Sequence, residues 1–147
     1  MSVYPAAALR DARLKLVEEH CLAENNHDLK AIMETFGRNP VFGLNDLEVS
    51  GRETVEGLYA GFGFGERGSF SDLRIEVVNR HVNDETIILE ITLGGKHTGD
   101  WNGLAPTGKE FRVPACAVFT FDDEGRLAGE KVYADLSIIL RQFGVIA

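Results

Sequence analysis

The chain has 147 residues and a formal net charge of −8, with 44% hydrophobic and 26% charged residues. This length and composition predict one soluble domain over residues 1–147 with a substantial hydrophobic core. The negative charge argues against nucleic acid or a membrane surface as a partner, and no apolar run reaches the length of a membrane span. The N-terminus does not follow the pattern of a secretory signal, and Cys21 and Cys116 lie in apolar patterns without metal-ligand spacing. We therefore expect free thiols and a cytoplasmic location.

Helices are predicted in the first half of the chain. Apolar periodicity predicts a first helix over about residues 7–24, with His20 in the middle of its apolar stripe. A second helix is indicated by apolar residues at helical spacing, which are Leu29, Ile32, Met33 and Phe36. Ser50 and Glu53 predict a capping box at the start of a third helix. The glycines of residues 61–65 then predict a mobile loop that carries two aromatic side chains and could gate a cavity.

Strands are predicted in the second half, where the apolar period changes to two. The expected strands cover about residues 73–78, 87–93, 113–121 and 126–135. A glycine-rich connection fills residues 94–109, and a short amphipathic helix over 136–143 ends at Gly144. Helices followed by antiparallel strands predict an α+β fold in which a curved sheet covers the helices and leaves a cavity between them.

Three segments of the second half carry a resemblance to a known family. They are the motif His97–Lys109 (HTGDWNGLAPTGK), the strand from Gly125 to Asp135 and the closing segment Leu140–Gly144 (LRQFG). Together they resemble the SnoaL-like polyketide cyclases, which belong to the nuclear-transport-factor-2-like superfamily with ketosteroid isomerase. The resemblance implies a cystatin-like α+β barrel: a highly curved mixed or antiparallel sheet that forms a cone around the N-terminal helices. It also implies an apolar pocket for a small apolar molecule, a homodimer formed through the sheet, and catalysis without a cofactor.

Asp135 and His97 are the predicted catalytic residues. In the family that the chain resembles, an aspartate in this late strand is the acid-base residue, and a desolvated carboxylate becomes a better base. Asp135 also directly precedes the last helix, where aspartate is a favoured N-cap. His97 has the side chain to shuttle a proton or to bond an enolate oxygen, or else only to hold its turn.

Four further side chains are candidates for substrate binding. His20 lies on the helix face expected to meet the cone, although a histidine there is more often a core residue. Tyr59 and Trp101 have the shape to form pocket walls or to act as ordinary core aromatics. Tyr133 alternates in phase with Asp135, so the two should point to the same side of their strand. The four histidines are scattered without ligand spacing and no nucleotide-binding motif occurs, so we expect no metal site.

Two functions remain open from the sequence. The first is a cofactor-independent acid-base enzyme, of cyclase, isomerase or dehydratase type, acting on an apolar substrate with a carbonyl group. The second is a non-catalytic module of the same fold that binds a ligand or dimerises. The two differ in whether Asp135 and a histidine converge on one cavity or Asp135 only caps the last helix.

Overall fold

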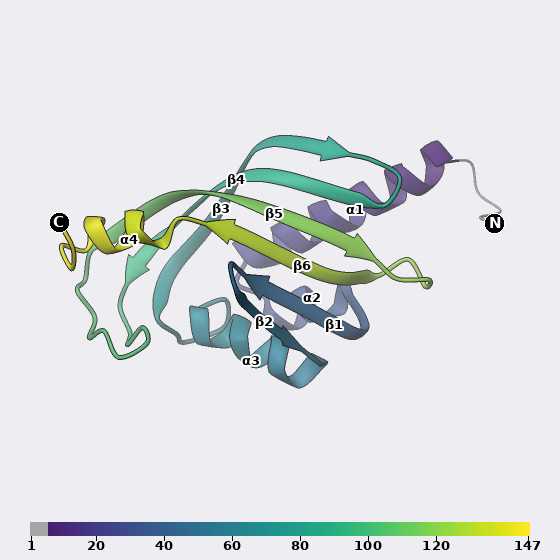
Figure 1. Cartoon of the computed structure of the whole chain (residues 1–147). Coiled ribbons are helices and arrows are strands. Elements are labelled where there is room, and N and C mark those ends of the chain that lie inside the picture. Colours follow the sequence, from purple (N-terminus) through teal and green to yellow (C-terminus); the bar gives the residue numbers. More distant parts are fainter. Residues whose placement is uncertain (1–5) are drawn as a thin grey trace.

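A computed structural model describes residues 6–147, and in it four helices and six strands follow one another along the chain. Figure 1 shows one sheet that bends around the N-terminal helices. The elements are α1 (Ala6–Asn25), α2 (Leu29–Glu34), β1 (Phe36–Leu44), β2 (Leu47–Ser50), α3 (Arg52–Phe62), β3 (Phe70–Val82), β4 (Thr86–His97), β5 (Glu110–Phe121), β6 (Leu127–Ala134) and α4 (Leu136–Gln142).

The strands form one mixed sheet in the order β2-β1-β6-β5-β4-β3. All neighbours pair antiparallel except β1 and β6, which run parallel. Irregular register in β1 and β3 accompanies the strong curvature, because a bulge bends its strand and increases the local twist. The α+β cone predicted from the sequence is thereby confirmed.

The three N-terminal helices lie on the concave side of the sheet (Figure 1). α1 packs on β3 and β4, α3 packs on β1 and β2, and α2 contacts both helices. Leu16, Val17 and His20 on α1 are buried, as the apolar stripe predicts. None of the helices within residues 6–147 is long and apolar enough to cross a membrane.

Two helix boundaries differ from the sequence prediction. Phe36 begins β1 instead of ending α2, because it pairs with Leu127 of β6 and the Leu127 amide donates to the Thr35 carbonyl. The pairing with a strand far along the chain therefore overrides the helical spacing. The N-cap of α3 is Gly51 without any side-chain bond, so the predicted capping box of Ser50 and Glu53 does not form.

The glycine-rich segment after α3 packs against the core, and its predicted mobility stays a prediction. Phe62 still belongs to α3, Gly63 caps the helix at a φ of 121°, and Phe64 is buried. A Cβ atom at Gly68 would lie 2.4 Å from the Gly63 nitrogen. These glycines permit a close approach of two backbone segments.

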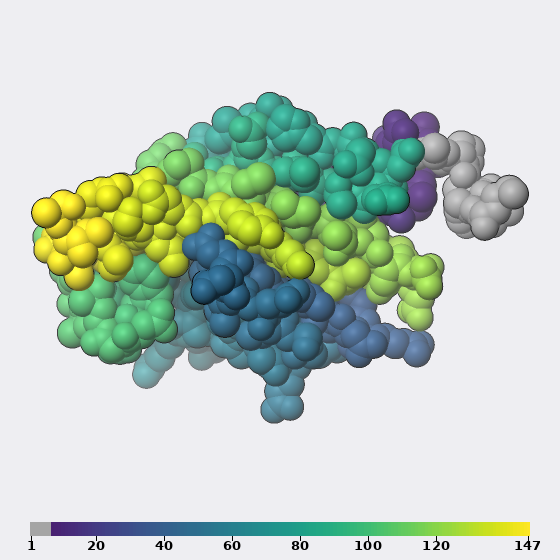
Figure 2. Space-filling model, viewed as in Figure 1, coloured from purple at the N-terminus to yellow at the C-terminus, as the bar shows by residue number. Residues whose placement is uncertain are grey.

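The loop after β4 and the C-terminal helix meet at one end of the molecule. Figure 2 shows the green loop residues directly against the yellow C-terminal segment. His97 ends β4 and pairs with Phe70 of β3, instead of opening the connection as predicted. Its ring stacks on Phe143 at a centroid distance of 4.8 Å, which joins the loop region to the chain end.

Candidate active site

A cavity of about 90 Å³ lies between the helices and the concave face of the sheet. Its walls are almost wholly aliphatic and aromatic, and they include Phe42, Phe64, Phe70 and Trp101. The polar side chains that line it are Glu24, Tyr59 and Glu130. These three side chains, together with His20 behind them, form a buried group that we call the inner cluster.

The inner cluster is assembled from three elements. His20 and Glu24 lie one turn apart on α1, Tyr59 comes from α3, and Glu130 comes from β6. All four residues are at most 3% exposed. Glu24 is buried because it lies one turn after His20 on the apolar face of α1. Glu130 points inward because side chains alternate along β6, and Val132 and Ala134 share its side of the strand.

The hydrogen bonds of the inner cluster show which of its atoms donate and which accept. The Thr35 hydroxyl donates to the Ile32 carbonyl, so its oxygen must accept from His20 Nδ1 at 2.8 Å. The Tyr59 hydroxyl donates to Glu130 Oε1, so its oxygen must accept from His20 Nε2 at 3.3 Å. Because both ring nitrogens donate, His20 is an imidazolium.

Two carboxylates surround the His20 imidazolium. Its Nε2 lies 3.2 Å from Glu24 Oε1 and 3.4 Å from Glu130 Oε1. Burial by itself lowers the pKa of His20, but the charges of Glu24 and Glu130 outweigh burial and raise this pKa to about 10. The charge state therefore agrees with the direction of the hydrogen bonds.

Glu24 is the member of the inner cluster with the fewest hydrogen bonds. Its Oε1 is close to His20 Nε2 but has no aligned hydrogen bond among the described residues. Burial raises the pKa of Glu24 to about 7, His20 opposes this shift, and Glu130 adds to it. Near neutral pH this carboxyl group can therefore both give and take a proton.

Tyr59 holds the cluster together rather than titrating. Burial, followed by the charges of Glu130 and Glu24, raises the pKa of its hydroxyl well above the usual value. The phenol therefore stays protonated and fixes Glu130 through its hydrogen bond.

The inner cluster also has the spacing to hold a metal ion. His20, Glu24 and Glu130 offer one ligand atom each, and these atoms lie within 4.8 Å of one another. The hydrogen bonds described above account for the same arrangement with a proton on each ring nitrogen of His20. The sequence-based expectation of no metal stays a prediction.

Three of the residues predicted to bind substrate lie at or beside this cavity. Tyr59 and Trp101 line it, and His20 lies directly behind the lining carboxylates. Tyr59 contributes both a wall and a polar group. Trp101, the only tryptophan of the chain, contacts Phe70 with a ring centroid distance of 5.2 Å.

Asp135 and Tyr133 lie on the outer face of the sheet. The Asp135 carboxylate is exposed and accepts the amide of Ser137 at 3.0 Å, which makes it the N-cap of α4. Its hydrogen bonds with Ser137 lower the pKa of this carboxyl. Tyr133 is 50% exposed. The two residues share a phase, as expected, but that phase points away from the cavity because Glu130, Val132 and Ala134 occupy the inward positions.

His97 is buried next to the cavity without lining it. Its Nδ1 accepts the Thr107 amide at 3.1 Å, so the neutral ring carries its proton on Nε2, which has no partner among the described residues. Phe70, Trp101 and Phe143 surround the ring. His97 and Asp135 therefore do not converge on one cavity.

Sequence reasoning missed Glu24 and Glu130. A signal for Glu24 was present, because it lies four residues after His20 and so shares its apolar helix face. A signal for Glu130 lay in Lys131, whose charge makes its own side of β6 the better candidate for solvent. Glu130, on the other side of β6, is therefore the residue that points inward.

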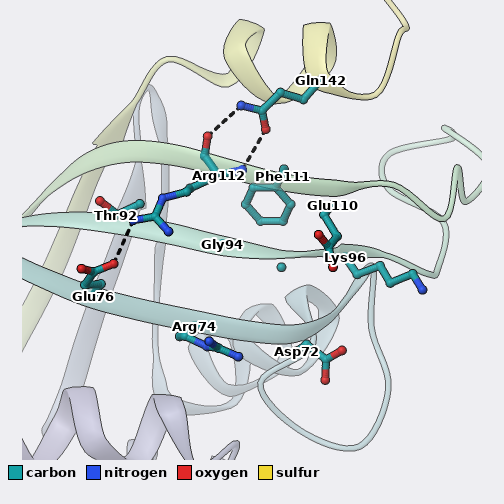
Figure 3. Close-up of a pocket in the computed structure, with 11 residues that line it drawn as sticks. Asp72, Arg74, Glu76, Thr92, Gly94, Lys96, Glu110, Phe111, Arg112 and Gln142 are labelled. Atoms are coloured by element: carbon teal, nitrogen blue, oxygen red, sulfur yellow. Dashed lines mark hydrogen bonds and ion pairs between the residues drawn. The ribbon is translucent and has the colours of Figure 1, made fainter.

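A larger hollow lies on the outer face of the sheet over β3, β4 and β5, with a volume of about 430 Å³ (Figure 3). We call it the outer groove. It carries acidic and basic side chains side by side, which are Asp72, Arg74, Glu76, Lys96, Glu110 and Arg112. Arg112 donates to Glu76 at 2.9 Å, but these side chains are 69% and 61% exposed. Solvent screens such a pair, so the outer groove lacks the desolvation that tunes the inner cluster.

Comparison with solved structures places the fold among known proteins. AclR, a putative hydroxylase from Streptomyces galilaeus, is 25% identical, with a TM-score of 0.77 over 93% of this chain and 83% of that chain. A putative SnoaL-like polyketide cyclase from Jannaschia sp. CCS1 is 20% identical, with a TM-score of 0.80 over 100% and 99% of the two chains. An LEH-like epoxide hydrolase from M. tuberculosis is 16% identical, with a TM-score of 0.72 over 92% of each chain.

Sequence comparison assigns the family. A search of curated proteins gives no significant match. The family model of the SnoaL-like polyketide cyclases matches residues 19–143, which include the inner cluster and every strand. The protein therefore belongs to the SnoaL-like polyketide cyclase family.

Proposed function

We propose that this protein is a cofactor-independent enzyme that transfers a proton on a small apolar molecule held in the cone. The observation that carries the proposal is Glu24, a buried carboxyl group at the cavity wall whose pKa is raised to about 7. A group that titrates near the working pH is the most effective general acid or base. Family membership supports a ligand-binding cone, and the reaction type is our inference.

Glu24 is the proposed general base and acid. As a carboxylate it takes a proton from a carbon atom next to a polarising group such as a carbonyl, and the electron pair of the broken C–H bond moves into the substrate. The same carboxyl group then returns the proton to another atom. This sequence of steps is common to isomerisation, dehydration and cyclisation.

Glu130, Tyr59 and His20 are the proposed positioning residues. The imidazolium lies between the two carboxylates, and Tyr59 anchors Glu130, so the Glu24 carboxyl group keeps one environment during turnover. The catalytic roles predicted for Asp135 and His97 have no support from this geometry, since neither residue lines the cavity. They enter the test as variants.

Hydrogen–deuterium exchange tests the proposal without knowledge of the product. Small cyclic and branched ketones, with and without an amino group, are incubated with the protein in D₂O, and proton NMR follows the loss of signal next to the carbonyl. We expect exchange above the protein-free rate, and a fall of about a hundredfold or more in Glu24→Gln. Asp135→Asn should keep the wild-type rate.

Two outcomes would overturn this assignment. If Glu24→Gln exchanges as fast as wild type, Glu24 is not the base. If Asp135→Asn or His97→Gln abolishes exchange while Glu24→Gln keeps it, the catalytic pair predicted from the sequence is correct. A chelator added to the wild-type reaction separates proton transfer by side chains from metal-assisted chemistry.

A non-catalytic binding module is the second candidate function. The observation that favours it is the position of Asp135, which caps α4 instead of facing a histidine across the cavity. No enzyme-dependent exchange on any ketone, combined with saturable ligand binding, would favour this function.

A further inference from the structure

The polar groups of the inner cluster offer a ligand hydrogen-bond acceptors but few free donors. The Tyr59 hydroxyl is used by Glu130, and both ring nitrogens of His20 are used by Thr35 and Tyr59. Glu24 offers one more donor when it is neutral, and Trp101 brings its indole N–H to the wall. A carbonyl or carboxylate oxygen placed beside Glu24 and Glu130 would therefore lose its bonds to water and gain little in return.

Acceptor atoms, in contrast, are left over. Glu24 is 3% exposed, its Oε1 has no hydrogen-bond partner among the described residues, and the side chain lines the cavity. Within the described part of the chain, Glu130 receives one hydrogen bond, from Tyr59. The Glu24 carboxyl group has the His20 imidazolium beside it, 3.2 Å from Oε1, and it can still accept hydrogen bonds from a ligand in the cavity.

The charges of the inner cluster point in the same direction. One imidazolium faces two carboxylates, so the cluster carries an excess negative charge whenever Glu24 is ionised. His20 is not part of the cavity wall, whereas both carboxylates are. A ligand in the cavity therefore meets the negative groups first.

The rest of the wall suits a cation as well. Aromatic rings from α3, β1, β3 and β5 face the same space as the carboxylates, and the centroids of Phe42 and Phe64 lie 5.2 and 5.6 Å from that of Tyr59. The face of an aromatic ring attracts a cation, most strongly where water is excluded. The volume of about 90 Å³ limits the ligand to a compact molecule.

We propose that the cavity binds a small apolar amine, whose ammonium group donates to Glu24 and lies against the aromatic wall. This inference deepens the proposed function and rests on it for the choice of site, but binding does not require turnover. It changes the expected substrate class, since a basic nitrogen rather than a carbonyl oxygen becomes the group that is recognised.

Titration with compounds of one shape tests the inference. The probes are cyclopentylamine, cyclopentanol, cyclopentanone and cyclopentanecarboxylate, added to the full chain at fixed ionic strength. Trp101 reports binding, because it is the only tryptophan and it lines the cavity. We expect cyclopentylamine to bind at least about tenfold more tightly than the ketone, which corresponds to one charge-assisted hydrogen bond.

The Glu24→Gln variant locates the preference. Glutamine keeps the shape of the side chain and removes its charge, so the amine should lose its advantage while cyclopentanone binds as before. The matched control is Glu76→Gln in the outer groove, where an exposed carboxylate is removed and the preference should persist. This control also covers general attraction of amines to a chain with a net charge of −8.

The inference is overturned if wild-type protein binds the ketone as tightly as the amine. It is also overturned if the amine advantage survives in Glu24→Gln. The comparison of probes on wild-type protein does not depend on the folding of any variant. Amine binding without hydrogen–deuterium exchange would contradict the proposed function alone, and exchange on neutral ketones without an amine preference would contradict only this inference.

Discussion

The inner cluster and the outer groove contain the same kinds of side chain in opposite surroundings. The outer groove is the larger hollow and holds more charged residues, yet its Arg112–Glu76 pair is more than half exposed. The inner cluster has only a few polar side chains, each at most 3% exposed, and burial shifts the pKa values of Glu24 and Tyr59. The comparison teaches that desolvation, rather than the number of charges or the size of a hollow, gives a site its chemistry.

Removal of His20 should have the largest effect on stability. In His20→Asn the carboxylates of Glu24 and Glu130 remain buried without their cation, and we expect a loss of about 3–5 kcal/mol in the free energy of unfolding. Urea denaturation measures the loss. His81→Asn is the matched control, since it removes an exposed histidine that also bonds a glutamate and should change little. Equal effects of the two substitutions would contradict the distinction between the two regions.

The stability of the protein should fall as the pH rises from neutral to alkaline values. The pKa of His20 is raised from 6.5 to about 10, so the folded state holds a proton that the unfolded state releases within this range. The resulting stabilisation is complete below pH 6.5 and is lost as the pH passes through 10. The raised pKa of Glu24 adds a decline between about pH 4.5 and 7, because folding opposes its ionisation.

Urea denaturation across this pH range measures the decline. His20→Asn should be flatter than wild type at the alkaline end, near pH 10, where the His20 contribution is lost. Near pH 7 the variant should instead keep or extend the decline from Glu24, because His20 no longer lowers the pKa of that residue. Burial also raises the pKa of Cys21, which steepens the alkaline end in both proteins and therefore cancels in the comparison. A wild-type curve as flat as that of the variant would show that His20 is neutral in the folded state.

Loss of the Tyr59 hydroxyl should have an intermediate effect. Tyr59→Phe keeps the aromatic wall but removes the donor to Glu130, and we expect a loss of about 1.5–3 kcal/mol, the usual range for a hydrogen bond to a charged group. Thermal or urea unfolding detects it. Tyr133→Phe, on the outer face and half exposed, should be indistinguishable from wild type. A comparable loss in both variants would remove the special status of the inner cluster.

The cap of α4 should contribute less. Asp135→Ala removes the acceptor for the Ser137 amide, so the melting temperature should fall by a few degrees. Asp135→Asn should restore most of the loss, because asparagine caps helices nearly as well as aspartate. Failure of the asparagine variant to recover stability would mean that the charge of Asp135, and not its capping, matters.

The smallest effect is expected in the outer groove. Arg112→Gln breaks the exposed pair with Glu76 but keeps the backbone bonds between residue 112 and Gln142 (Figure 3). The free energy of unfolding should stay within about 0.5 kcal/mol of wild type. A larger loss would show that exposed charges contribute more to this protein than their solvation suggests.

The sequence predicts the order of helices and strands because local periodicity determines it. Phe36 is a position where local periodicity gives the wrong element. Its spacing fits a helix, but pairing with Leu127 makes it the first residue of β1. The prediction of which side of β6 faces the cavity is wrong for a similar reason. Alternation states that Tyr133 and Asp135 share one side, while the neighbouring strands β1 and β5 decide which side faces the helices.

The candidate site was only partly accessible to sequence reasoning. His20 and Tyr59 stand out because polar groups interrupt apolar helix stripes, and both belong to the inner cluster. Glu24 and Glu130 look like ordinary surface carboxylates when each is read alone. Their role emerges only when α1 and β6, which are distant in sequence, meet in the cone.

The position of β6 in the sheet has a consequence for folding. It is the last strand of the chain, yet it lies between β1 and β5 and is the only connection between the β1–β2 pair and the β3–β4–β5 meander. Until β6 docks, the sheet consists of two separate pieces, and Glu24 and His20 have no Glu130 beside them. The protein should therefore fold slowly for its size, because contacts of high sequence separation must form before the sheet is continuous. A ribosome would have to release the chain as far as β6 before the site exists.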